Sequence, residues 1–110
     1  MKKYKYQILQ TNVKQEFAFA SWRTAIGRGW SFDSYHSVWS GDGEAKDDLD
    51  LLEYLYMVFN EYHPNGFNGH SLSVSDIVKL HSEDEDKPKY YYCDSFGWVD
   101  ITSNITEKRG

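Results

Sequence analysis

The stretch DDLDLLEYLYMVFNEYHPNG, residues 47–66, carries the clearest structural signal in the chain. Its apolar side chains recur at helical spacing, which predicts a helix with one buried face. Either Asp47 or Asp48 can cap the first turn, and the acidic residues there complement the helix dipole. Pro64-Asn65-Gly66 ends the helix. The buried stripe is expected to contain Leu51, Leu55, Val58, Phe59 and Tyr62, and the exposed face Asp48, Glu53 and Glu61.

The residues that follow this helix predict three strands in a β-meander. The first strand is expected over residues 75–81 and the second over residues 89–94, joined by a polar loop with four consecutive acids. A turn at residues 95–97 leads into a third strand over residues 98–102. Residues 103–110 are polar and are expected to form a C-terminal tail, so that a single domain spans residues 1–102.

The residues before the helix predict two more strands and one more helix. Tyr4, Tyr6 and Ile8 alternate on one face of a strand. A helix is expected from about Lys14 to Ile26, although residues 17–19 are also compatible with an extended start. A strand over residues 34–40 and a turn at residues 41–43 follow. The order β-α-β-α-β-β-β predicts an α+β fold, a mainly antiparallel sheet with two helices on one face.

The composition limits what the protein binds. The chain of 110 residues has the size of one domain. A formal net charge of −5 argues against a general grip on nucleic-acid backbone, which requires lysine and arginine to neutralise phosphates. The single cysteine cannot form an intrachain disulfide, and the sequence shows neither a signal peptide nor an apolar run long enough for a membrane span. We expect a cytoplasmic protein without direct nucleic-acid or membrane contact.

Two sequence blocks resemble a known family. FNGHSLSVSDIV at residues 67–78 and YYCDSFGW at residues 91–98 are similar in residues and spacing to the YodL-like domain. The resemblance is strong in the second half of the chain and follows only in outline in the first half. It implies a protein of conjugative or integrative mobile elements of Firmicutes, where such domains occur alone or beside antirestriction functions. It implies no catalytic residues.

The first block also has a physical interpretation as a structural motif. A glycine at position 69 permits positive φ or close backbone approach. The serines are suited to bonding nearby backbone groups. The carboxylate of Asp76 is expected to anchor a turn, and a ring nitrogen of His70 to hold it. The motif residues are Gly69, His70, Ser71, Ser73, Ser75 and Asp76.

Enzymatic and metal chemistry find little support. Cys93 with His70 and either Asp76 or Asp94 contains the groups of a thiolate nucleophile. Cys93, however, follows three tyrosines in a strand and lacks the helix N-terminus that commonly activates a thiol. The histidines do not share the spacing of helical metal ligands, and no CxxC is present. We expect no enzyme activity, no metal and no cofactor. The histidines are His36, His63, His70 and His81.

The acidic residues therefore lead the functional hypothesis. They cluster around the start of the central helix and in the loop of the meander, and such surfaces attract basic partners. We expect a non-catalytic inhibitor that imitates nucleic-acid phosphate and occupies the basic cleft of a host protein, such as a CRISPR effector or restriction enzyme. The alternatives are an interaction module of conjugation machinery with an aromatic contact patch, and a Cys93-dependent enzyme. The expected contact residues are Asp47, Asp48, Glu53, Glu83, Asp84, Glu85 and Asp86, with Trp39 or Trp98 as an anchor.

Overall fold

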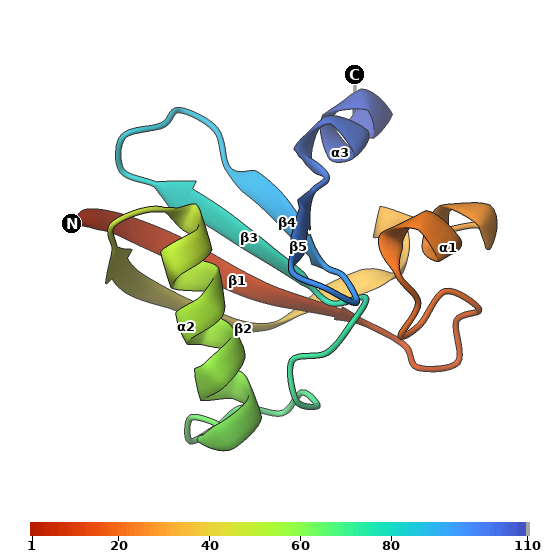
Figure 1. Cartoon of the computed structure of the whole chain (residues 1–110), viewed down its shortest axis with the longest axis horizontal. Coiled ribbons are helices and arrows are strands. Elements are labelled where there is room, and N and C mark those ends of the chain that lie inside the picture. Colours follow the sequence, from red (N-terminus) through yellow and green to blue (C-terminus); the bar gives the residue numbers. More distant parts are fainter. Residues whose placement is uncertain (110) are drawn as a thin grey trace.

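The computed structural model describes the backbone of residues 1–109 and the side chains up to Ile105. It is built on a five-stranded antiparallel sheet with the strand order β2-β1-β3-β4-β5 (Figure 1). The element order confirms the expected α+β fold and adds a third helix at the end. The elements are β1 (Lys2–Thr11), α1 (Trp22–Gly27), a short 3-10 helix η1 (Phe32–Ser34), β2 (Tyr35–Ala45), α2 (Asp48–Glu61), β3 (Ile77–Ser82), β4 (Lys89–Cys93), β5 (Trp98–Asp100) and α3 (Thr102–Arg109).

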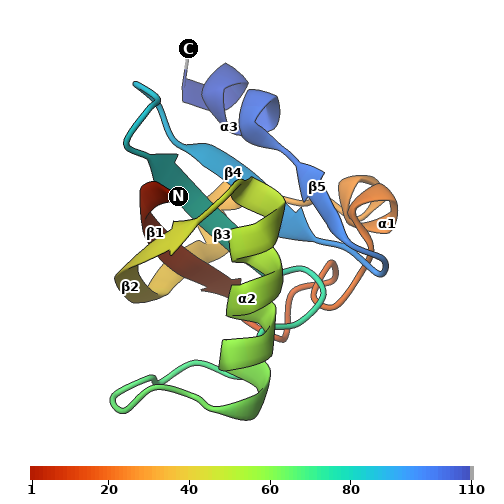
Figure 2. The same ribbon diagram turned by 60° about the vertical axis from the view of Figure 1, so that its left-hand side comes forward.

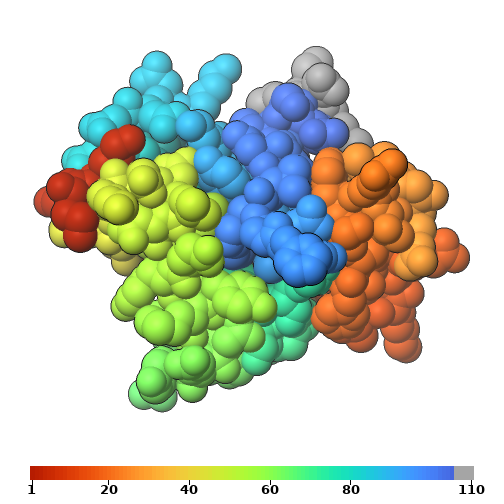
Figure 3. All heavy atoms as spheres, viewed as in Figure 1, coloured from red at the N-terminus to blue at the C-terminus, as the bar shows by residue number. Residues whose placement is uncertain are grey.

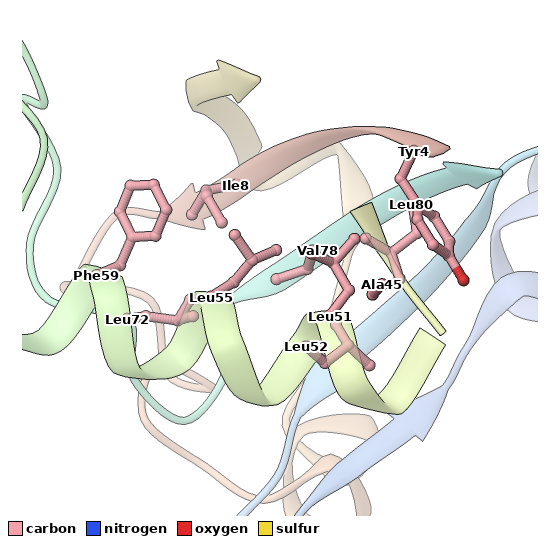
Figure 4. Packing of buried hydrophobic residues seen from close by; sticks show 10 residues of the cluster. All are labelled: Tyr4, Ile8, Ala45, Leu51, Leu52, Leu55, Phe59, Leu72, Val78 and Leu80. Carbon is pink, nitrogen blue, oxygen red and sulfur yellow. The ribbon is translucent and has the colours of Figure 1, made fainter. Parts of the chain in front are cut away.

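Helix α2 covers one face of the sheet. Its start is capped by Asp47, whose carboxylate accepts a 2.9 Å hydrogen bond from the Asp50 N–H. Three of its leucines, Leu51, Leu52 and Leu55, and Phe59 pack against β1 and β3, where Ile8 and Val78 are fully buried (Figure 4). Burying each such side chain contributes roughly 1.5–3 kcal/mol, so this contact holds the helix on the sheet.

The opposite face is covered by α1, α3 and residues 12–35. Figure 2 shows α2 crossing in front of the sheet. The neighbours Ile8 and Leu9 belong to different cores, as do Val78 and Ile77, because successive strand residues point to opposite faces. The expectation of two helices on one face is thus corrected: α2 has one face to itself, and α1 and α3 pack on the other. The second core contains Leu9, Phe17, Ala20, Ala25, Ile77, Tyr90, Tyr92, Ile101 and Ile105.

The C-terminal segment differs from the tail that the polar composition suggested. Residues 102–109 form α3, and Ile105 is 2 % exposed because it packs into the second core. The domain therefore extends past residue 102. Position 110 of the expected tail lies outside the described residues. No helix within residues 1–109 has the length and apolar character needed to cross a bilayer.

The first half of the chain contains two further corrections. Helix α1 starts only at Trp22, and the preceding residues form successive turns, with Phe19 at a φ of 62°. The strand β2 runs straight through Gly41 and Gly43, where a turn was expected. A Cβ at Gly41 would lie 2.7 Å from the Tyr6 hydroxyl oxygen, and one at Gly43 would lie 3.2 Å from Leu51 Cδ1. These glycines admit neighbouring side chains and do not reverse the chain.

Candidate functional site

The two acidic clusters lie at the same end of the molecule. Asp48 at the start of α2 and Glu85 in the β3–β4 loop both approach the Lys89 ammonium, at 3.9 and 3.5 Å. Figure 3 shows this loop, the first residues of the chain and the start of α2 side by side. Two surface hollows, of about 660 and 400 Å³, are lined from both clusters. We call this region the acidic end; its carboxylates lining the hollows are Asp42, Glu44, Asp47, Asp48, Glu83 and Glu85.

Asp48 has an internal role at this end. Its carboxylate accepts hydrogen bonds from the hydroxyls of Tyr4, at 2.8 Å, and Tyr91, at 2.6 Å. Burial, and next the bond to this carboxylate, raise the pKa of both phenols well above their usual range. The side chain of Asp48 is only 17 % exposed. It therefore ties α2 to β1 and β4 and is a poor candidate for contact with a partner.

Lysines are interleaved with the carboxylates. Lys3 and Lys5 line the larger hollow, and Lys2 and Lys89 line the smaller one. The Lys5 ammonium lies 3.6 Å from Asp42, with both side chains at least 80 % exposed. Such exposed pairs contribute little to stability, so the charges remain available to other ions. The acidic end is thus negative on balance but carries both signs.

The two tryptophans named as anchors lie in different surroundings. Trp39 packs against Phe59 and Phe67, and its indole N–H donates to the Tyr6 hydroxyl at 3.3 Å, so it belongs to the core. Trp98 lines the smaller hollow, 6.4 Å from the ring of Tyr56. Only Trp98 is placed to anchor a partner at the acidic end.

Exposed apolar side chains near Trp98 were missed from the sequence. Leu49 is 58 % exposed, Tyr56 is 41 % exposed, and Phe96 in the turn after β4 is 96 % exposed. The spacing in the sequence could have indicated two of them. Leu49 and Tyr56 fall outside the buried stripe and are seven residues apart, which places them on one flank of α2. The remaining expected contact residues, Glu53, Asp84 and Asp86, are exposed.

The FNGHSLSVSD block is joined to β1 by a side chain that the sequence analysis missed. Gln10, 2 % exposed, donates from Nε2 to the His70 carbonyl at 2.8 Å and to Asp76 Oδ2 at 3.1 Å. Its Oε1 accepts from the His70 N–H at 3.2 Å. A Cβ at Gly69 would lie 2.4 Å from this oxygen, which explains the glycine by close approach.

Asp76 is the polar centre of the block. It is 1 % exposed, and its Oδ2 accepts a 2.8 Å hydrogen bond from the Ser73 N–H, which closes the turn before β3. His70 Nε2 lies 3.8 Å from Oδ1, and His70 Nδ1 lies 2.8 Å from the Ser71 carbonyl. Burial raises the pKa of Asp76 to about 7, against the lowering effect of the Ser73 bond and of His70. The hydroxyl of Ser73 donates to the Ser71 carbonyl at 2.7 Å.

Ser75 connects the block to three other segments. It adopts a φ of 83°, and its hydroxyl accepts from the Phe19 N–H at 2.9 Å. The Tyr35 hydroxyl donates to the Ser75 carbonyl at 2.6 Å, and the Ser75 N–H donates to the Cys93 carbonyl at 2.9 Å. These contacts account for the block as a junction between β2, β4 and the segment before α1.

The thiol of Cys93 is not activated. Cys93 is 3 % exposed, and its Sγ lies 4.0 Å from the Asp94 carbonyl. Burial, and next the carboxylates of Asp76 and Asp94, raise the pKa of the thiol to about 12. A nucleophilic cysteine requires the thiolate, which this environment disfavours at neutral pH.

Among the side chains up to Ile105, no three His, Cys, Asp or Glu residues converge as metal ligands would.

Comparison with known proteins agrees with the two sequence blocks. The family model for the YodL-like domain matches residues 3–103, nearly the whole chain. No match was found among curated proteins or among solved structures. The matched region extends from β1 to the start of α3 and includes both faces of the sheet. The chain therefore belongs to the YodL-like domain family.

Proposed function

We propose that this protein is a non-catalytic binding protein of a mobile genetic element, which docks its acidic end on a basic cleft of a host nucleic-acid-handling defence protein and thereby inhibits it. The observation that carries the proposal is the convergence of the α2 start and the β3–β4 loop around Lys89. Two clusters 30 to 40 residues apart in the sequence thus act as one charged surface. A CRISPR effector or a restriction enzyme has a cleft of the required sign, because it binds phosphate backbone.

The structure narrows the contact residues within this proposal. Asp48 and Trp39 are hydrogen-bonded to tyrosine hydroxyls within the protein, whereas Trp98 lines the smaller hollow at the acidic end. Charged rim residues accelerate association, and a partly buried aromatic residue supplies much of the binding energy. The contact surface is therefore proposed to comprise Trp98 and the remaining acids of the two clusters, Asp47, Glu53, Glu83, Asp84, Glu85 and Asp86.

A second candidate function is an interaction module of conjugation machinery, in which apolar contact dominates. The exposed Leu49, Tyr56 and Phe96 near Trp98 favour it. The two candidates differ in salt dependence, because exposed charges are screened within about 10 Å at 0.1 M salt and apolar contacts are not. Binding that is indifferent to salt would therefore favour the second candidate.

The test is affinity capture from a bacterial lysate, followed by titration of each captured protein. The variant D84K/E85K/D86K reverses three charges of the acidic end, and E16K/D33K/E61K makes the same charge change at exposed positions elsewhere. We expect a nucleic-acid-binding protein to be retained by the wild type and the control but lost, at least tenfold in affinity at low salt, by the first variant. Capture of such a protein with equal affinity by the wild type and by both variants would contradict docking through the acidic end.

A further inference from the structure

The two edges of the sheet are built differently. The edge strand β5 has 3 residues, and α3 follows it almost directly. The edge strand β2 has 11 residues and is the longest strand of the sheet. In the described part of the chain β2 pairs with β1 alone, and Figures 1 and 2 both place it at the margin of the sheet. A long row of outward backbone N–H and C=O groups is therefore available for pairing.

The usual protection of an edge strand is only partly present in β2, which has one register shift and two exposed acids but no lysine or proline. Natural edges are blunted by short strands, lysines, prolines or bulges. The sequence of β2, YHSVWSGDGEA, has no lysine, arginine or proline. One register shift at Ile8/Leu9 interrupts its pairing, and from Trp39 to Ala45 the register is regular. Seven consecutive residues thus offer a regular outer edge.

The side chains of this stretch have an alternating pattern. Asp42 and Glu44 are exposed on the face of the sheet opposite α2, where they lie across from Lys5 and Lys3. Gly41 and Gly43, on the α2 face, have no side chain. An added strand would therefore meet carboxylates on one face. On the other face it would meet Trp39 and the side chains of Tyr6 and Leu51, which lie against the two glycines.

We propose that β2 receives an extended segment of a partner protein as an additional strand, a segment in which lysine or arginine alternates with apolar residues. This inference rests on the proposed function and adds to it a second contact with the partner, at the outer edge of β2. Cross-strand neighbours on one face lie about 4.5–5.5 Å apart at Cβ, which brings each cation of the segment to Asp42 or Glu44. The segment's apolar side chains would pack beside Trp39 and the Tyr6 ring that lies against Gly41, and its backbone would pair with the outer edge of β2.

A second copy of this chain fits the edge less well. Two antiparallel β2 strands would bring Asp42 and Glu44 of both copies together at the new junction, and like charges directly opposite one another destabilise strand pairing. Lys5 already lies 3.6 Å from Asp42, but both side chains are at least 80 % exposed, so this ion pair is weak and leaves Asp42 able to pair with another cation. Charge complementarity therefore favours a basic segment.

The probes are three seven-residue peptides: one alternating lysine and valine, one alternating glutamate and valine, and the lysine peptide with alternate backbone amides N-methylated. Each is titrated into the isotopically labelled full chain, and amide shifts and hydrogen exchange are followed by NMR. The variant D42K/E44K is compared with D33K/E61K, which makes the same charge change away from β2.

Strand addition predicts that the lysine peptide shifts and protects amides of residues 39–45 and that N-methylation reduces its affinity at least tenfold. The affinity of the lysine peptide for D42K/E44K should be at least tenfold lower than for the wild type, and the glutamate peptide should bind this variant instead. The control variant should bind both peptides as the wild type does. The N-methylated peptide keeps the test valid if D42K/E44K fails to fold.

Four results would overturn the inference. The first is that the amide shifts are confined to residues 83–86 and the start of α2, and the second is that the N-methylated peptide binds as tightly as the unmodified lysine peptide. The third is that the lysine peptide does not bind, and the fourth is that sedimentation shows a dimer formed through β2. None of the four refutes the proposed function, which the capture experiment tests separately through D84K/E85K/D86K.

Discussion

Replacing Asp76 by asparagine should change how the stability of the protein depends on pH. Burial raises the pKa of this carboxyl from 3.8 to about 7 in the folded protein. Between these values the folded state holds a proton that the unfolded state has lost, so the stabilisation is complete below pH 3.8 and disappears as the pH rises through 7. About three pH units at about 1.4 kcal/mol each correspond to roughly 4 kcal/mol.

The D76N variant isolates this contribution because its amide is neutral throughout. The asparagine oxygen can still accept from the Ser73 N–H, so the turn before β3 is retained. We expect the difference in unfolding free energy between wild type and D76N to change by roughly 4 kcal/mol from pH 4 to pH 8, in the direction that favours D76N at high pH. Urea unfolding followed by tryptophan fluorescence at five pH values measures it.

The exposed Asp86 provides the matched control, since D86N removes a carboxylate that is already in water. Its stability should follow that of the wild type across the same pH range. If the D76N and wild-type curves run parallel within about 1 kcal/mol, the raised pKa and the desolvation that explains it are both refuted.

Three further substitutions test other contacts. Y91F removes a hydroxyl that donates to Asp48 at 2.6 Å and should lower the unfolding free energy by about 1–3 kcal/mol, whereas Y62F, at a residue 70 % exposed, should have no measurable effect in urea unfolding. G69A places a methyl group 2.4 Å from Gln10 Oε1 and should lower the melting temperature, whereas G27A meets no atom within 4 Å; equal melting temperatures would contradict the close approach. I105A should cost about 2–5 kcal/mol because Ile105 is 2 % exposed, and an unchanged urea midpoint would show that α3 does not complete the second core.

The parts of the fold that could be predicted are those specified by neighbouring residues. Helix α2 has its cap, its apolar stripe and its terminating Pro64 within one stretch, and the structure confirms the helix over Asp48–Glu61. Tyr62 was wrongly placed in the buried stripe, because it follows the helix and is 70 % exposed. The strands of the meander were found from alternation and turn residues in the same way. By contrast, α3 has a polar sequence, and it is secured through Ile105 by a core assembled from distant strands.

The errors at the candidate site have the same cause. Gly41 and Gly43 suggested a turn, but they are needed because Tyr6 and Leu51 approach the backbone. Gln10 has no local signal, since its partners are 60 and 66 residues away. The sequence showed Asp48 to be an acid near a helix start, but not that two tyrosine hydroxyls from β1 and β4 occupy its oxygens.

The position of β1 has a consequence for how the protein is made. This strand is synthesised before both of its neighbours in the sheet, and one of them is β3, whose last residue is Ser82. The second core also needs Ile105 in α3. During synthesis β1 can pair with β2 first, but its contacts with β3 and with the second core must wait for these later residues, so one edge of the Tyr-rich strand stays unpaired during that time. Chaperone dependence during translation, more than stability once folded, is expected to limit the yield of truncated or stalled forms.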